Sequence, residues 1–138
     1  MKALTTTLAL ATAAGALSFA SVTTEPAHAA SHYAMVCLSN STTANIKFTW
    51  KEGNGASRTA FIAPGSNLKW TYRYAHANDN RSPRLVVSYD ADARATNFTQ
   101  HTHLERYATV GDTCGEAKRY AFQYEPANRN FIRIVVLN

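Results

Sequence analysis

The chain has 138 residues, a formal net charge of +5 and two cysteines. Its 46% hydrophobic and 17% charged residues are typical of a folded domain and exclude a disordered, highly charged chain. Beyond residue 30 no stretch approaches the roughly 18 consecutive apolar residues of a membrane-spanning helix, so we expect no membrane span in that part.

The first 30 residues have the three regions of a cleavable signal peptide. Lys2 supplies a positive charge, residues 3–20 are mostly Ala and Leu, and the segment ends Ala27-His28-Ala29-Ala30 with small residues at the expected cleavage site. We therefore predict a signal peptide over residues 1–30 and an exported domain over residues 31–138. The domain is expected to be secreted or periplasmic.

The first strand of the exported domain is expected at residues 32–38 and carries Cys37. The second cysteine, Cys114, also lies after the signal segment. In an oxidising compartment a lone pair of cysteines is expected to form a disulfide. A pair of reactive thiols would instead favour the Cys-x-x-Cys spacing, which the chain lacks. The sequence therefore predicts a Cys37–Cys114 bridge.

Apolar and polar residues alternate along most of the exported part, which is the period of a half-buried strand. Residues 131–137 differ, because they form a nearly continuous β-branched run that predicts a central strand covered on both faces. Only at residues 104–110 does a short helical turn compete with a strand. The alternating segments are residues 45–51, 67–74, 85–89 and 119–125.

Turn residues separate these strands. Glu52-Gly53-Asn54-Gly55 predicts a tight hairpin, Pro64-Gly65 predicts a type II turn, and residues 75–83 form a polar loop. Seven to nine short strands in one domain predict an all-β fold, an antiparallel two-sheet sandwich stapled by one disulfide. A small β-barrel is the alternative.

Two histidines form the sharpest motif. On a strand, His101 and His103 share one face, so both imidazoles can approach a single metal ion. The spacing identifies no third ligand, and the simpler interpretation is a polar strand face. Metal binding through these two residues is therefore an alternative hypothesis. The leading expectation is that the protein has no cofactor.

Positive charge is the remaining indication of a partner. Lys47 and Lys51 lie on the polar face of one predicted strand, and Lys69 and Arg73 lie on that of another. If the two strands are neighbours, these cations form a stripe that attracts an anionic polymer of the cell envelope. A solvated face whose lysines discourage edge pairing is the competing interpretation. Export argues against nucleic acid as the partner.

The sequence contains no Gly-x-Ser-x-Gly, His-Glu-x-x-His or phosphate-binding glycine loop, so we expect no enzyme activity. The leading hypothesis is an exported, non-enzymatic binding module whose partner is an anionic envelope polymer or another protein. A secreted inhibitor or effector is a further alternative, and Arg81 in the 75–83 loop is its best contact residue. The oligomeric state is not predicted.

Overall fold

The structure, a computed structural model, describes residues 28–94 and 97–138, so nearly all of the predicted signal peptide lies outside the described residues. The described part contains no helix that is long and apolar enough to cross a membrane. Its strands are β1 (Tyr33–Asn40), β2 (Ile46–Glu52), β3 (Arg58–Ile62), β4 (Asn67–Arg73), β5 (Leu85–Asp90), β6 (Thr99–Leu104), β7 (Tyr107–Thr109), β8 (Lys118–Tyr124) and β9 (Ile132–Val136).

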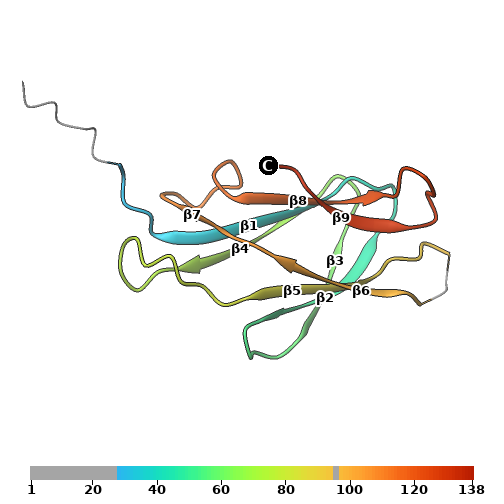
Figure 1. The fold of residues 1–138 in the computed structure, drawn as a ribbon. Helices are drawn as coiled ribbons and strands as arrows, with labels where there is room; N and C mark the ends of the chain where they lie inside the picture. Colours follow the sequence, from blue (N-terminus) through green and yellow to red (C-terminus); the bar gives the residue numbers. More distant parts are fainter. Residues whose placement is uncertain (1–27, 95–96) are drawn as a thin grey trace, which may run out of the picture.

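These strands form two sheets that lie one above the other (Figure 1). The five-stranded sheet has the order β4-β1-β8-β9, with β7 also paired to β1, and the four-stranded sheet has the order β3-β2-β5-β6. Neither sheet closes on itself within the described residues, so the predicted sandwich is confirmed and the barrel is not formed. The strand pairs are antiparallel except for β1 and β8, which run parallel.

The central strand covered on both faces is β1. Val36 and Leu38 face the interior between the sheets, while Met35 and Cys37 on the opposite face are buried in a second, smaller apolar cluster. Both faces of β1 therefore need apolar side chains, which explains its nearly continuous run.

The prediction of a central strand at residues 131–137 is wrong. The strand there, β9, lies at the end of the five-stranded sheet and pairs with β8 alone among the named strands, and Val136 and Leu137 are exposed. A run of apolar residues indicates how much of a strand can be buried, but it does not indicate which strands pair with it. The segment at residues 104–110 ends β6 and forms β7 rather than a helical turn.

Aromatic rings fill the space between the sheets. Phe48 of β2 lies 6.2 Å from Trp70 of β4 and 5.9 Å from Phe122 of β8, measured between ring centroids. Phe122 also packs edge-on against Tyr89 of β5 at 5.1 Å. Because each fully buried ring contributes about 1.5–3 kcal/mol relative to an exposed one, this cluster is a main source of cohesion between the two sheets.

The predicted turns are present where the backbone needs glycine. Gly53 has a φ of 51° in the hairpin that joins β2 to β3, and Gly65 has a φ of 74° in the turn before β4. Positive φ values of this size are accessible to glycine at little cost. The first turn thereby separates β2 from β3, and the second separates β3 from β4.

Candidate functional site

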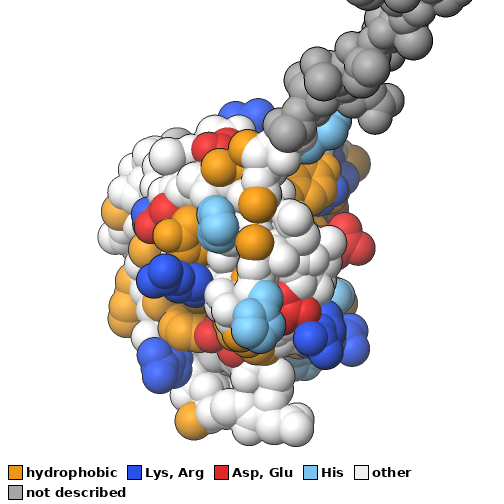
Figure 2. Space-filling model, turned by 90° about the vertical axis from the view of Figure 1, so that its left-hand side faces the viewer, with side chains coloured by type: hydrophobic (Ala, Val, Ile, Leu, Met, Phe, Trp, Pro, Cys, Tyr) orange, Lys and Arg blue, Asp and Glu red, His pale blue; other side chains and the backbone are white. Residues whose placement is uncertain are grey.

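Arg81 lies on the loop between β4 and β5 and is strongly exposed, with 86% of its side chain accessible to solvent. Its Nε lies 2.6 Å from Asp79 Oδ1. The loop is tethered at Asn78, whose side-chain oxygen accepts hydrogen bonds from the Ser31 N–H and hydroxyl at 2.8 and 2.9 Å. In Figure 2, which views the end of the sandwich that carries this loop, basic, acidic and histidine side chains are mixed rather than gathered.

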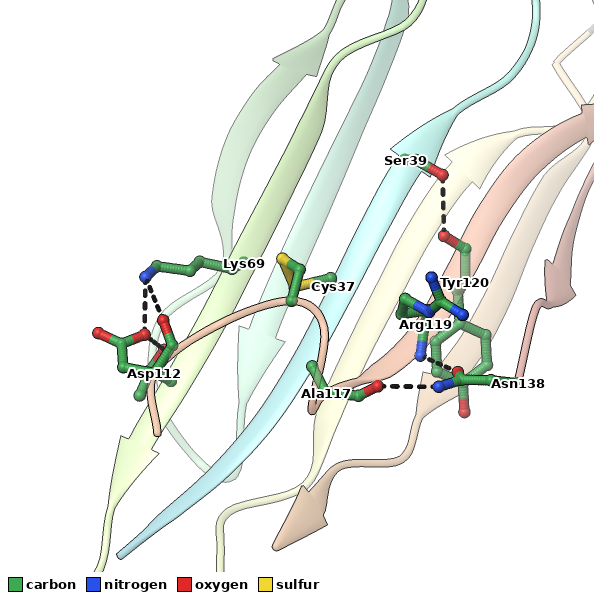
Figure 3. The surroundings of a disulfide bond; sticks show 10 residues. Cys37, Ser39, Lys69, Asp112, Ala117, Arg119, Tyr120 and Asn138 are labelled. Carbon is green, nitrogen blue, oxygen red and sulfur yellow. Dashed lines mark hydrogen bonds and ion pairs between the residues drawn. A yellow bond between two sulfur atoms is a disulfide. The ribbon is translucent and has the colours of Figure 1, made fainter. Parts of the chain in front are cut away.

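The outer face of the five-stranded sheet is partly covered by the segment between β7 and β8. The predicted disulfide joins Cys37 of β1 to Cys114 in this segment across 77 residues of sequence (Figure 3). The Lys69 ammonium of β4 lies 2.6 Å from Asp112 Oδ1 and also donates to the Asp112 carbonyl oxygen at 3.1 Å. The hydrogen bond from Lys69 lowers the pKa of the Asp112 carboxyl below its ordinary value.

The chain end covers the neighbouring part of this face. Asn138 Nδ2 donates to the Ala117 carbonyl oxygen at 3.1 Å, and Asn138 Oδ1 accepts from the Arg119 N–H at 2.6 Å (Figure 3). Between these contacts and the disulfide there is a hollow of about 270 Å³ that Arg119 lines together with Cys37 and Cys114. The covering segments thus bury the part of this face around Cys37, whereas Arg73 and Arg119 stay exposed.

The outer face of the four-stranded sheet has a different character. The strand registers place Lys51, Val86 and His103 in one row across β2, β5 and β6. The next row runs through β3, β2, β5 and β6 and consists of Thr59, Thr49, Ser88 and His101. We call this surface the open face; its outward residues are Lys47, Thr49, Lys51, Thr59, Phe61, Val86, Ser88, Asp90, Thr99, His101 and His103.

Both predicted histidines are on the open face, exposed and on the same side of β6. The Ser88 hydroxyl of the neighbouring strand lies 2.6 Å from His101 Nδ1, which leaves His101 Nε2 without a hydrogen-bond partner among the described residues. No group of three His, Cys, Asp or Glu side chains able to hold a metal ion occurs in the described ranges. Metal binding by His101 and His103 stays a prediction.

The four predicted cations do not form one stripe, which corrects the assumption that their strands are neighbours. Lys47 and Lys51 belong to β2 in the four-stranded sheet, whereas Lys69 and Arg73 belong to β4 in the five-stranded sheet. Alternation identifies the polar face of a strand but not the sheet that contains it. The structure instead brings Lys47 and Lys51 onto the same face as the histidines of β6.

The open face has little negative charge to offset its lysines. Asp90 is the one acidic residue among its described members, and Asp90 Oδ1 already accepts the N–H groups of Asp92 and Phe98, each at 3.0 Å. Phe61 is 66% exposed, and the Lys47 ammonium lies 5.9 Å from the centre of its ring. The surface combines ammonium groups, hydroxyls and one exposed aromatic ring.

Sequence reasoning missed a buried ion pair at one end of the open face. The Arg106 side chain is 3% exposed, pairs with Glu52 at the end of β2, and donates from Nη1 to the Pro83 carbonyl oxygen at 2.6 Å. Its Nε has no hydrogen-bond partner. Arg106 lies in a polar stretch without apolar alternation, so the local sequence gave no signal of burial. The pair joins β2, the loop before β5 and the turn after β6.

Comparisons with known proteins return nothing that matches this chain, whether protein-family models, curated proteins or solved structures. Function is therefore inferred from the surface chemistry described above.

Proposed function

We propose that the protein is an exported, non-enzymatic binding module that holds an anionic polymer against the open face. The observation that supports this proposal best is the exposure of Lys47 and Lys51 on a face whose single described carboxylate, Asp90, is occupied by backbone N–H groups. Such a face attracts anions electrostatically. The Cys37–Cys114 bridge fits an oxidising compartment, as expected for an exported protein.

The spacing of the charges favours a polymer over a small anion. Lys47 and Lys51 are four residues apart on one strand, which corresponds to about 13 Å along the strand. Two ammonium groups at that distance engage separate charges of a chain rather than one phosphate or carboxylate. Phe61 offers a ring face of the kind that sugars contact, and Thr49 and Thr59 offer hydroxyls. The ligand class that fits best is an anionic glycan.

The test is salt-dependent retention on immobilised heparin, used as a sulfated glycan probe. We expect the wild type to be retained at low ionic strength and released as salt screens the contacts. Lys47→Gln/Lys51→Gln is expected to elute at clearly lower salt. The matched control, Arg73→Gln/Arg119→Gln, removes the same charge from exposed positions on the other sheet and is expected to elute close to the wild type. Equal effects of the two variants, or no wild-type retention, would contradict the proposal.

One observation favours a second candidate function, inhibition of a protease that cleaves after arginine. Arg81 is a strongly exposed cationic side chain on a loop tethered at Asn78, which is how a rigid inhibitory loop presents its contact residue. The carboxylate of an arginine-specific pocket would replace Asp79 as its partner. Inhibition of trypsin by the wild type but not by Arg81→Ala would support this candidate, and inhibition by neither would remove it.

A further inference from the structure

Strand β6 differs from the other strands that end the two sheet orders. Edge strands are normally protected against pairing by charged residues or proline. Of the four end strands, β3 contains Arg58, β4 contains Lys69 and Arg73, and β9 contains Arg133. Strand β6, with the sequence Thr-Gln-His-Thr-His-Leu, contains neither a charged residue nor proline. Its edge is therefore the least protected of the four.

The backbone groups on the free edge of β6 can be identified from the hydrogen bonds to its neighbour. The Ala91 N–H donates to the Phe98 carbonyl oxygen at 2.9 Å, in the register that continues through the β5–β6 pair. In an antiparallel pair every second residue is hydrogen-bonded to its opposite neighbour. The N–H and C=O groups of Thr99, His101 and His103 consequently point away from β5, toward the free edge.

A second copy of the chain can pair with this edge in a symmetric register that brings the histidines together. If two β6 strands pair antiparallel about a two-fold axis at Thr102, His101 stands opposite His103 of the partner subunit, and the reverse. Residues opposite each other share a face of the sheet, with Cβ atoms about 4.5–5.5 Å apart. Four imidazoles then meet on one side of the continuous sheet, two from each copy.

We propose that β6 is a metal-dependent self-association site, in which one divalent transition-metal ion is bound by His101 and His103 of two copies. One copy supplies two imidazoles, and none of the described residues adds a third ligand in a group with them. Two copies supply four nitrogen ligands, a set that suits Zn²⁺ and Cu²⁺. The site is incomplete without the second copy.

The surroundings of His101 support ligation through its free nitrogen. A histidine that binds a metal ion through Nε2 carries its proton on Nδ1 and usually donates it to an oxygen nearby. Ser88 Oγ lies 2.6 Å from His101 Nδ1 and supplies that oxygen. The ring is thus oriented before any metal ion arrives. This inference stands independently of the anionic glycan proposed above.

The test is the molar mass of the wild type measured by light scattering, in EDTA and with half an equivalent of ZnCl₂ per chain. We expect a monomer in EDTA, a dimer with zinc, and a calorimetric stoichiometry of one zinc ion per two chains. His101→Gln/His103→Gln is expected to stay monomeric, whereas His76→Gln, at an exposed loop histidine, behaves as the wild type. A dimer that persists in EDTA, or zinc bound one to one without dimer, would overturn the proposal.

The register is tested by mixing two single variants. His101→Gln retains His103 and His103→Gln retains His101, so a mixed dimer restores one directly opposed imidazole pair, while each variant alone retains only a diagonal pair. We expect zinc to promote the mixed dimer at least tenfold more strongly than either variant alone. Equal zinc response in the mixture and in the separate variants would exclude this register. Unchanged thermal midpoints in EDTA establish that the variants fold.

Discussion

The Ile134 N–H donates a hydrogen bond of 3.2 Å to the Tyr89 hydroxyl, and this bond joins β9 of one sheet to β5 of the other. The backbone continues the connection nearby, because the Ile132 N–H donates to the Ala91 carbonyl oxygen at 2.8 Å. The end strand β9 is therefore held from two sides, by its ladder to β8 and by bonds that cross the sandwich. Tyr89 therefore supplies a polar contact between the two sheets, which we call the Tyr89 clamp.

Replacing Tyr89 by phenylalanine tests this clamp. Tyr89→Phe keeps the ring that packs on Phe122 but leaves the Ile134 N–H without its acceptor. We expect the free energy of unfolding to fall by about 1–2 kcal/mol, because the partly buried Ile134 N–H loses its acceptor. Urea denaturation at neutral pH measures it. Tyr107→Phe, at an exposed tyrosine, is the control and is expected to change stability by less than about 0.5 kcal/mol; equal changes would refute the clamp.

The same residue predicts a dependence of stability on alkaline pH. Burial raises the pKa of Tyr89 above the ordinary value of 10.0, because the charged phenolate is disfavoured in the interior. The contribution of Tyr89 is thus complete below about pH 10 and is lost as pH rises through its raised pKa. We expect the unfolding free energy of the wild type to decline above pH 10 more steeply than that of Tyr89→Phe. Parallel pH profiles would contradict this assignment.

Asn40, at the end of β1, is predicted to be a second polar anchor. It is 1% exposed, its Nδ2 donates to the Ala44 and Ile62 carbonyl oxygens at 2.7 and 2.9 Å, and its Oδ1 accepts from Thr42. We expect Asn40→Ala to lower the unfolding free energy by about 3 kcal/mol or more, since several buried groups lose partners at once. Asn45→Ala, at an exposed position a few residues on, is the control for urea denaturation. A loss below 1 kcal/mol would show that the turn forms without Asn40.

Much of the fold was predictable because strand periodicity is local. Alternation at residues 45–51 and 85–89 identified β2 and β5 and the faces they bury, and the expectation of export together with a lone cysteine pair predicted the bridge. Partner choice is not local. Whether β2 lies beside β4, or whether β1 rather than β9 is central, depends on contacts between distant segments that no single stretch encodes.

In the candidate site, too, local features were predictable from the sequence and contacts between distant strands were not. That His101 and His103 share a face follows from their spacing on one strand. That Lys51 lies in the same row as His103 follows from the registers of β2, β5 and β6, which the sequence did not reveal. The burial of Arg106 was missed for a related reason, because its ion partner is 54 residues away in the chain.

The disulfide is predicted to be a major source of stability. It closes a separation of 77 residues, for which loop-entropy arguments give about 4–5 kcal/mol. Cys37→Ala/Cys114→Ala is expected to lose that amount and to free the segment between β7 and β8, whose Ala117 packs with Met35 in the smaller apolar cluster. Urea denaturation of the oxidised wild type and of the double variant measures the difference. The unfolding free energy of the wild type under reducing conditions should match that of the double variant. A loss of unfolding free energy below about 1 kcal/mol would show that the covering segment stays in place without the bridge.

The Glu52–Arg106 pair predicts an asymmetry between two matched substitutions. Arg106 is 3% exposed and Glu52 is 36% exposed, so the two charges differ in their access to water. Glu52→Met leaves a buried guanidinium without its carboxylate and is expected to lower the unfolding free energy by about 3 kcal/mol. Arg106→Met leaves a carboxylate that water can reach and fills the space with an apolar chain, so a loss of about 1–2 kcal/mol is expected. Denaturant unfolding of both single variants and of the double variant measures these losses. If Arg106→Met costs as much stability as Glu52→Met, or more, Arg106 finds another partner when Glu52 is removed.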